Sequence, residues 1–527
     1  MLQLSIDNQT IKVPEGTTVL KAAEQLGIKI PTMCYKEGFS NHPSCMVCLV
    51  KVLDTGKFEP ACALLAKDRM NISTNLPDVL KARKQALELL LSDHVGDCEA
   101  PCRMTCPAFM DIPKMNRLIA NGKFDEAIQV VKEEIALPFI LGYICPAPCE
   151  KTCRRAQVDD AISICRLKRF SAQADFENKT PYFPEKQSAT NKKIAIIGTG
   201  PAGLSAAFYL LKDGYECTLF DKNEKAGGEI RYKIPEEILP AKVLDYEIEL
   251  IEKYGAKFVL NKLITKDFFE NELLKIFDAI IFATGNYENS NLPDFSFGKG
   301  KDGILTDKNS YQINDKIFAC GNIIKPSRMA VKSAAQGKET AFSVNLYLKG
   351  EKSAVKRQKF NSKFGKLFPS EIEEYKKETT QINSEERIVN SEFVHKNLTK
   401  EQAIIEAKHC MNCDCRKPET CKLRIYSDEY QADRQSFLYG ERKHIKKYFQ
   451  HETVVYEPQK CIKCNLCVEI TEKNKELIGL STIKRGFDVE ISVPFNKSMN
   501  LALQKTALEC AESCPTGAIS LKIKSEE

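Results

Sequence analysis

The 527-residue sequence contains no tryptophan, only 6 histidines and no long hydrophobic run. No apolar stretch approaches the roughly 18 residues that a membrane-spanning helix requires. The opening residues, MLQLSIDNQT, lack the basic and apolar regions of a secretory signal. Basic residues do not alternate with aromatic ones along a stripe, and the formal charge of +6 is a small excess, so a nucleic-acid binder is not indicated. We therefore expect a cytoplasmic chain with no membrane span.

Cysteine, in contrast, is abundant, with 22 residues. Disulfide bonds are rare in the cytoplasm, so cysteines at this density indicate metal ligation or redox chemistry. The composition excludes a secreted disulfide scaffold and a typical metal-free enzyme. Cys217 and Cys320 stand alone, and we expect Cys320 to be a small buried residue. The other cysteines form groups at 34–62, 98–106, 145–165, 410–421, 461–467 and 510–514.

The first cysteine group follows two predicted strands and a predicted helix, Thr18 to Leu26. Three cysteines close together and one remote cysteine can enclose two irons and two sulfides. A structural zinc site is the alternative, although zinc ribbons usually pair two short knuckles. The segment resembles the N-terminal β-grasp [2Fe–2S] domain of the large iron–sulfur subunit of respiratory NADH dehydrogenase and of [FeFe] hydrogenases. The candidate ligands are Cys34, Cys45, Cys48 and Cys62.

The same resemblance continues through KARKQALELLLSDH to His94. In that family a His-x3-Cys-x2-Cys motif ligates a [4Fe–4S] cluster. Here Cys98 and Cys102 are separated by one residue more than in the family motif. His94 is therefore a candidate ligand, and a histidine that hydrogen-bonds the chain at a helix end is the alternative.

A predicted helical region with two cysteine groups follows. The sequences CEAPCRMTCPAFMDIPKMNRLIANGKFDEAI and YICPAPCEKTCRRA resemble the helical Fe–S domain of the glutamate synthase small subunit, which dihydropyrimidine dehydrogenase shares. That domain holds two [4Fe–4S] clusters whose ligands cross between the two cysteine groups. The family's fourth ligand for the second cluster is Gln or Glu, and the matching position lies near Lys168, which cannot serve. We expect Cys165 to substitute. The resemblance implies one cluster on Cys98, Cys102 and Cys153 and another on Cys106, Cys145 and Cys149. Each set lacks a fourth ligand, for which His94 is the candidate in the first cluster and Cys165 in the second.

A glycine-rich turn between a predicted strand and a predicted helix lies in KKIAIIGTGPAGLSAAFYL. Gly198 allows the tight turn, Gly200 lets the backbone approach a pyrophosphate, and Gly203 lets the helix pack on the strand. Asp221 ends the next strand and is placed to hydrogen-bond a ribose hydroxyl. The pattern predicts a Rossmann-like dinucleotide-binding domain.

Three later segments, AGGEIRYKIP, FDAIIFATG and KIFACGNIIKPSRMAVKSAAQGKETA, resemble FAD-domain motifs of the glutamate synthase family and imply bound FAD. In the family an NAD(P)H domain lies between the last two motifs. Here only 35 residues separate Gly285 from Gly321, where on the order of 100 are needed. We therefore expect no NAD(P)H site on this chain. The candidate cofactor-binding residues are Gly198, Gly200, Pro201, Ala202, Gly203, Asp221, Gly228, Arg231, Thr284, Gly285, Gly321, Asn322, Met329 and Ala330.

Two further cysteine groups lie near the C-terminus. Four cysteines within twelve residues predict a [4Fe–4S] or a zinc site, and spacing does not decide between them. The last group, three close cysteines and a remote Cys-Pro, is typical of a ferredoxin. It resembles the two-cluster ferredoxin module of hydrogenases and NADH dehydrogenases, but of the second cluster's ligands only Cys510 is present, and we expect it to be unligated. The candidate ligands are Cys410, Cys413, Cys415 and Cys421, and then Cys461, Cys464, Cys467 and Cys514.

These resemblances imply one FAD, one [2Fe–2S] cluster and three or four [4Fe–4S] clusters. In both parent families a catalytic domain follows the ferredoxin module, whereas this sequence ends at Glu527, so we expect no catalytic residues here. The expected function is an electron-transfer subunit of an NAD-linked oxidoreductase complex, of hydrogenase or formate dehydrogenase type, with electron bifurcation left open. The expected partners are an NADH-oxidising flavoprotein subunit, a catalytic hydrogenase or formate dehydrogenase subunit, and ferredoxin. The alternatives are a free-standing FAD and Fe–S oxidoreductase and a partner-binding scaffold with a vestigial flavin site.

The expected fold is multidomain, of α/β and α+β class. The expected domains are a β-grasp ferredoxin domain at 1–75, a helical Fe–S domain at 76–185, a Rossmann-like FAD domain at 192–350, a linker at 351–394, a four-cysteine segment at 395–430 and a bacterial-ferredoxin-like domain at 431–527.

Overall fold

The fold was analysed in a computed structural model. It describes residues 1–527 except 41, 179, 288–292, 294, 296, 378, 380–396 and 523–527. The chain divides into two compact units. The domain boundaries expected from the sequence remain predictions, because each unit combines several of the expected domains. The first unit comprises Met1–Ala100, Lys359–Glu378 and Asn412–Glu527, and the second comprises Pro101–Gln358 and Thr379–Met411.

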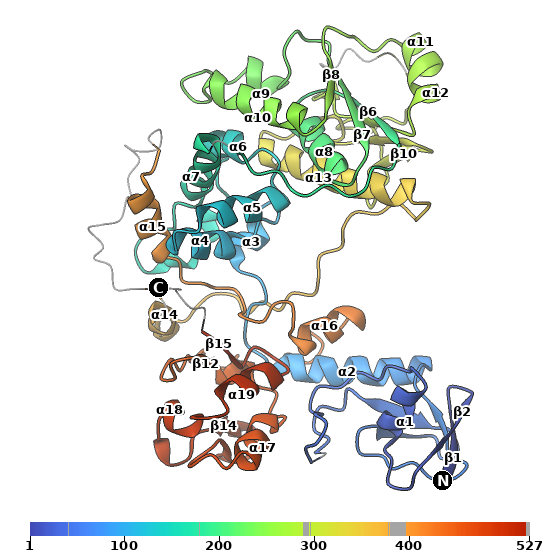
Figure 1. The fold of residues 1–527 in the computed structure, drawn as a ribbon, viewed down its shortest axis with the longest axis vertical. Coiled ribbons are helices and arrows are strands. Elements are labelled where there is room, and N and C mark those ends of the chain that lie inside the picture. Colours follow the sequence, from blue (N-terminus) through green and yellow to red (C-terminus); the bar gives the residue numbers. More distant parts are fainter. Residues whose placement is uncertain are drawn as a thin grey trace. The chain divides into compact units, whose positions relative to one another are not determined.

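The N-terminal part of the first unit is a five-stranded sheet in the order β2-β1-β5-β3-β4 (Figure 1). β1 and β5 run parallel, and the other neighbouring strands run antiparallel. Leu4 and Ile6 of β1 are buried against α1, whose N-cap Thr18 accepts a hydrogen bond from the Lys21 N–H. The elements are β1 (Leu2–Ile6), β2 (Gln9–Val13), α1 (Val19–Gln25), β3 (Leu49–Val52), β4 (Lys57–Pro60) and β5 (Asn71–Ser73).

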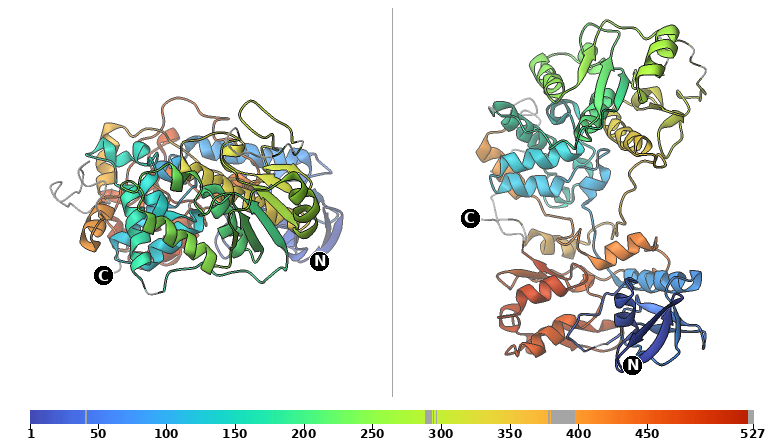
Figure 2. Two further views of the ribbon diagram at one scale, coloured as in Figure 1. Left: turned by 90° about the horizontal axis from the view of Figure 1, so that it is seen from above. Right: turned by 45° about the vertical axis from the view of Figure 1, so that its right-hand side comes forward.

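The rest of the first unit is built from helices and two short antiparallel strand pairs, β12 with β15 and β13 with β14. Leu87 and Leu91 of α2 share a hydrophobic core with Leu423 of α16. The right-hand view of Figure 2 shows the C-terminal strands and helices, in red, as a group of their own. The elements are α2 (Pro77–Asp93), α14 (Pro369–Lys376), α16 (Lys422–Glu429), β12 (Val454–Tyr456), α17 (Leu466–Lys473), β13 (Ser481–Ile483), β14 (Glu490–Ser492), α18 (Met499–Ala502), α19 (Ala507–Ser513) and β15 (Ile519–Leu521).

The segment 351–394, expected to be a linker, contains α14 and lies partly outside the described residues. Proline at the first helical position favours the start of α14. Glu371 of α14 is buried and forms an ion pair with Arg442, with a distance of 2.6 Å between nitrogen and oxygen. These contacts hold α14 in the first unit, which the polar composition of the segment did not indicate.

The second unit begins with a bundle of helices around one large hydrophobic core. α4 packs against α5 and α15, and α7 packs against α5 and α6. The helices are α3 (Pro101–Thr105), α4 (Ile112–Ala120), α5 (Phe124–Glu134), α6 (Pro138–Ile144), α7 (Ile164–Glu177) and α15 (Lys400–Lys408), with two 3₁₀ turns, η1 (Glu150–Thr152) and η2 (Arg154–Gln157).

A six-stranded sheet in the order β10-β11-β9-β6-β7-β8 follows, parallel except for β10. α8 and α13 lie side by side in Figures 1 and 2 and pack closely. A Cβ at Gly337 would come within 2.1 Å of the Ala202 carbonyl oxygen, so only glycine permits this approach. The elements are β6 (Lys193–Ile197), α8 (Pro201–Lys212), β7 (Glu216–Phe220), α9 (Glu229–Tyr232), α10 (Ala241–Lys253), β8 (Lys257–Val259), α11 (Lys266–Phe268), α12 (Leu274–Ile276), β9 (Ala279–Phe282), β10 (Gln312–Asn314), β11 (Ile317–Ala319) and α13 (Ala330–Leu348).

Among the described residues, no helix combines the length and the apolar character needed to cross a lipid bilayer.

Candidate nucleotide pocket and metal centres

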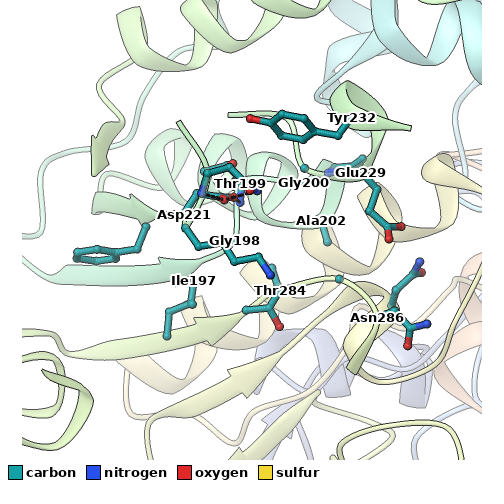
Figure 3. A pocket seen from close by; sticks show the side chains of 18 of the residues that line it. Ile197, Gly198, Thr199, Gly200, Ala202, Asp221, Glu229, Tyr232, Thr284 and Asn286 are labelled. Carbon is teal, nitrogen blue, oxygen red and sulfur yellow. Dashed lines mark hydrogen bonds between the residues drawn. The ribbon is translucent and has the colours of Figure 1, made fainter. Parts of the chain in front are cut away.

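A pocket of about 510 Å³ opens beside the turn between β6 and α8 (Figure 3). Gly198 in this turn has a φ of +109°, and a Cβ there would lie 2.4 Å from the Ala283 carbonyl oxygen. A Cβ at Gly203 would lie 2.0 Å from the Gly198 carbonyl oxygen. Both glycines are therefore required for the turn to fold beneath the pocket, as the glycine spacing predicts.

Asp221 follows β7 and holds the turn in place. One of its carboxylate oxygens accepts hydrogen bonds from the Thr199 N–H at 2.9 Å and from the Thr199 hydroxyl at 2.6 Å. The other oxygen accepts a hydrogen bond from the Asn223 N–H at 2.9 Å. Asp221 also lines the pocket, so it fixes the turn and remains beside the space that a ribose would occupy.

The lining of the pocket fits a dinucleotide. The Thr284 hydroxyl is buried in the lining and has no hydrogen-bond partner among the described residues. A Cβ at Gly200 would meet no atom within 4 Å, so the backbone there is open to a ligand. The amino end of α8 begins at the next residue and favours a negative charge. Three lysines, Lys222, Lys233 and Lys262, add positive charge to the lining.

The pocket includes most of the residues that the glycine-rich motifs predicted. Arg231 does not line the pocket. It donates a hydrogen bond to the Ala226 carbonyl oxygen and forms an ion pair with Asp245. Gly203 and Gly321 support the turn from beneath, and Met329 and Ala330 lie outside the lining. Tyr232 and Lys233 were missed although they lie in the quoted segment AGGEIRYKIP. Lys222 and Lys262 were missed because they lie outside the motifs that identified the site. The predicted residues that line the pocket are Gly198, Gly200, Pro201, Ala202, Asp221, Gly228, Thr284, Gly285 and Asn322.

The first four cysteines of the chain meet in the N-terminal sheet region. The Cys34 and Cys45 sulfurs lie 3.4 Å apart, and the Cys48 and Cys62 sulfurs lie 3.5 Å apart. Hydrogen bonds from Cys45 and Cys62 lower the pKa of the Cys34 thiol. All four side chains are buried, so the structure gathers the predicted ligands of the first site.

Four cysteines also gather in the helical bundle of the second unit. Cys106, Cys145, Cys149 and Cys165 line one small cavity. A hydrogen bond from Cys165 lowers the pKa of the Cys145 thiol to about 5. The cavity is otherwise lined mainly by apolar residues, so its polar groups are the four thiols and Lys168.

Lys168 lies beside these cysteines. Its Nζ donates a hydrogen bond to the Leu141 carbonyl oxygen at 3.0 Å. Burial alone would lower the pKa of Lys168, but the negative charges of the four thiolates raise it overall. The ammonium group is therefore a buried positive charge next to the cavity.

A third four-cysteine set lines a small cavity in the C-terminal part of the first unit. Cys461, Cys464, Cys467 and Cys514 line it together with Tyr456. The Cys461 sulfur accepts a hydrogen bond from the Lys463 N–H at 3.3 Å, and the Cys514 sulfur accepts one from the Ile519 N–H at 3.5 Å. Such bonds to sulfur are common around iron–sulfur clusters.

Cys510 is fully buried but does not line this third cavity. His94 is also buried, and its Nδ1 lies 3.3 Å from the Lys460 carbonyl oxygen. Burial lowers the pKa of His94 to about 4. The contact with Lys460 is of the kind expected for a histidine that hydrogen-bonds the chain, and ligation by His94 stays a prediction.

The ligand sets expected for the remaining cysteines stay predictions. Cys98 contacts Cys415, whose N–H donates a hydrogen bond to the Cys98 carbonyl oxygen at 3.2 Å. Cys102, Cys153 and Cys410 pack against the helical core of the second unit. Among the described residues, no three His, Cys, Asp or Glu side chains are arranged to hold a single metal ion. The first set of four cysteines is defined by contacts between pairs of sulfurs, and the other two sets are defined by the cavities that they line.

Three family models match parts of the chain. Residues 1–77 match a 2Fe-2S iron-sulfur cluster binding domain. Residues 84–180 match dihydropyrimidine dehydrogenase domain II with a 4Fe-4S cluster, and residues 196–263 match an NAD(P)-binding Rossmann-like domain. The last match is to an NAD(P)-binding domain, so it does not support the expectation that the chain has no NAD(P)H site. That expectation rested only on the short interval between two motifs.

Curated relatives match part of the chain. The NADPH-Fe(3+) oxidoreductase subunit beta of Geobacter sulfurreducens is 36% identical over 39% of this chain and 31% of its own length. The NADP(+)-dependent formate dehydrogenase subunit beta of Moorella thermoacetica is 35% identical over 39% of this chain and 32% of its own length. The glutamate synthase [NADPH] small chain of Bacillus subtilis is 37% identical over 36% of this chain and 38% of its own length. The matched region therefore spans about a third of each of these relatives.

Proposed function

We propose that this chain is an iron–sulfur flavoprotein that transfers electrons as a subunit of an oxidoreductase complex. The observation that carries the proposal is the presence, in one chain, of a dinucleotide pocket and three separate four-cysteine sets. Bound FAD exchanges electrons in pairs or singly, and iron–sulfur clusters pass them one at a time. A chain with both kinds of site is suited to converting paired electrons into single ones.

The pocket residues have defined tasks in this proposal. The turn that contains Gly198 and Gly200, with the amino end of α8, binds the pyrophosphate of FAD. Asp221 orients the adjoining ribose, and the Thr284 hydroxyl supplies a hydrogen bond to the cofactor. The apolar side chains of Ile197 and Ile264 exclude water from one wall of the pocket.

The cysteine sets have separate tasks. Cys34, Cys45, Cys48 and Cys62 hold a [2Fe–2S] cluster, in the region that matches the 2Fe-2S family model. Cys106, Cys145, Cys149 and Cys165 hold a [4Fe–4S] cluster, in the region that matches the 4Fe-4S family model. A further [4Fe–4S] cluster is held by Cys461, Cys464, Cys467 and Cys514.

The proposed partners follow from the relatives, two of which are named as beta subunits. A pyridine-nucleotide-oxidising flavoprotein would deliver electrons, and a catalytic subunit such as a formate dehydrogenase or a hydrogenase would exchange them with its own substrate. Both assignments rest on the relatives' names and on the sequence resemblance.

A second candidate function is favoured by the match of residues 196–263 to an NAD(P)-binding domain. In this case the chain would oxidise NADH or NADPH by itself, without a partner flavoprotein. One experiment distinguishes the two. Iron, sulfide, zinc and FAD are counted in protein purified without oxygen, and then NADH and NADPH are added separately while the flavin absorbance is followed.

About 10 irons for these three clusters, or about 14–18 with one or two further four-iron centres on the remaining cysteines, together with one FAD and no bleaching by either nucleotide, would support the partner-dependent subunit. Rapid bleaching by one nucleotide would favour the free-standing enzyme. A chain that retains neither iron nor FAD would contradict both candidates and would leave the partner-binding scaffold.

A further inference from the structure

The segment from Cys410 to Cys421 reads in the sequence as one four-cysteine site, but the structure distributes it over two units. The second unit ends at Met411, and the first unit resumes at Asn412. Cys410 therefore belongs to the second unit, and Cys415 and Cys421 belong to the first. Each unit places other cysteines beside its own part of the segment.

In the first unit, Cys98, Cys415 and Cys421 are neighbours and all three are buried. The Cys415 N–H donates a hydrogen bond to the Cys98 carbonyl oxygen at 3.2 Å. Cys421 is the N-cap of α16, and Arg424 of that helix forms a buried ion pair with Glu99, the residue after Cys98. The three thiols also lie within electrostatic range of one another. These contacts hold the three cysteines in one region of the first unit.

The surroundings of this trio suit a negatively charged iron–sulfur centre. The Ser362 N–H donates a hydrogen bond to the Cys98 sulfur at 3.4 Å. The cation of Arg424, buried in an ion pair with Glu99, lies within electrostatic range of Cys98. A Cβ at Gly517 would come within 2.7 Å of the Cys415 sulfur, so glycine leaves the thiol its space. Backbone N–H donors and nearby cations of this kind stabilise thiolate ligands.

In the second unit, two hydrogen bonds connect the segments that carry Cys102, Cys153 and Cys410. The Thr152 hydroxyl donates to the Thr105 hydroxyl at 3.1 Å, which ties the residue before Cys153 to the helix of Cys102. The Arg155 guanidinium donates to the His409 carbonyl oxygen at 3.4 Å, which ties the turn after Cys153 to the residue before Cys410. All three cysteines pack against the same hydrophobic core.

We propose that the 410–421 segment serves two iron–sulfur clusters rather than one metal site. Cys98, Cys415 and Cys421 ligate one cluster, and Cys102, Cys153 and Cys410 ligate another. This grouping rests on the proposed function and extends it. It places Cys98 and Cys102 in different clusters, whereas the sequence assigned both to one cluster. The centre in the first unit thus draws its ligands from both sides of the flavin domain in the sequence.

The test compares paired serine variants of the full chain, purified without oxygen, by iron and sulfide content and by the electron paramagnetic resonance spectrum after dithionite reduction. Cys415→Ser and Cys410→Ser are each expected to lose about four irons. The double variant Cys98→Ser/Cys415→Ser should lose no more iron than either single variant. Cys410→Ser/Cys415→Ser should lose about eight, and two sets of signals. Cys217→Ser, a lone buried thiol, is the matched control and should lose none.

The opposite pattern would overturn the grouping: about four irons lost from Cys410→Ser/Cys415→Ser, and no additional loss when Cys102→Ser is combined with Cys98→Ser. If serine prevents folding, Cys98→Asp and Cys415→Asp keep a possible iron ligand and are expected to alter the same resonance signal. Alteration of two different signals would contradict the proposal. A wild-type chain without iron would overturn the proposed function as well, whereas the opposite pattern in an iron-loaded chain affects the grouping alone.

Discussion

The buried carboxylate of Glu457 lies 2.7 Å from the Lys460 ammonium nitrogen and 3.1 Å from a guanidinium nitrogen of Arg416. Burial alone would raise the pKa of Glu457, but the cations of Lys460 and Arg416 dominate and lower it to about 2. The negative charge of Glu457, shortly before Cys461 in the sequence, therefore compensates the positive charges of two buried side chains.

Glu457→Gln removes this compensation, because glutamine keeps the shape but not the charge. We expect a loss of about 3–5 kcal/mol in the free energy of unfolding, the usual cost of leaving a buried charge without its partner. Chemical denaturation followed by circular dichroism measures it. Glu452→Gln, at an exposed position in the same segment, is the control and should change stability little. Equal stability of the two variants would show that water reaches the buried cations.

Cys165→Ser tests the fourth ligand of the helical cluster. If Cys165 ligates it beside Cys106, Cys145 and Cys149, the variant should lose about four irons per chain while the [2Fe–2S] absorbance persists. Iron analysis and visible spectroscopy measure both. Cys510→Ser is a matched control, because Cys510 is buried beside a cluster cavity without lining it. Unchanged iron in Cys165→Ser would remove this residue from the ligand set.

Gly200→Ala tests the nucleotide pocket without disturbing the turn. A Cβ there meets no protein atom within 4 Å, so the apoprotein should keep its melting temperature. The methyl group would nevertheless occupy the space above the turn where a pyrophosphate approaches. We expect FAD retention, measured by fluorescence after denaturation, to fall at least tenfold.

Two comparisons sharpen that result. Gly203→Ala should lose both FAD and stability, because its Cβ would lie 2.0 Å from the Gly198 carbonyl oxygen. Gly298→Ala lies outside the pocket lining and should affect neither. Full retention of FAD in Gly200→Ala would mean that the cofactor binds elsewhere.

Glu247 of α10 gives the stability of the second unit a pH dependence. Its carboxyl group accepts hydrogen bonds from the Phe139 and Ile140 N–H groups at 2.6 and 2.8 Å. Burial nevertheless raises the pKa of Glu247 to about 8, from an ordinary value of 4.5. Between these two values the folded chain holds a proton that the unfolded chain has released, so rising pH lowers the stability across that window.

The measurement is the free energy of unfolding from pH 5 to 8, compared between the wild type and Glu247→Gln. Glutamine cannot ionise, so the variant should lack the part of the pH dependence that Glu247 causes, which is on the order of a few kcal/mol. Glu249→Gln, exposed on the same helix, is the control and should follow the wild type. Parallel curves for Glu247→Gln and the wild type would show that this carboxyl ionises freely in the fold.

The sequence predicted those sites whose residues lie in one short motif or in a known spacing. The glycine turn after β6 is a short motif, and local geometry brings its residues together. The set of Cys461, Cys464, Cys467 and Cys514 has a known spacing, in which a distant Cys-Pro supplies the fourth ligand. The N-terminal set also gathers as the spacing suggested. In each case the chain between the ligands is short or belongs to a single small fold.

Prediction was poorer where separate segments meet. Nothing in the spacing of Cys410 and Cys415 indicates that the chain passes from one compact unit to the other between them. The helix α14 was not predicted, because it is only 8 residues long and its Glu371 contacts Arg442, which is 71 residues away in the sequence. Lys222, Lys233 and Lys262 could not be assigned to the pocket, since lysine is common on any surface.

The buried ammonium group of Lys168 has a consequence for electron flow. A fixed positive charge stabilises whichever state of a neighbouring cluster carries the additional electron, and so it raises the reduction potential of that cluster. A cluster held by Cys106, Cys145, Cys149 and Cys165 would therefore be reduced more readily, and would stay reduced at higher potentials, than the same cluster without the charge. The related family has Gln or Glu near this position, and neither is positively charged, so the order in which the centres are reduced would differ from the order in that family.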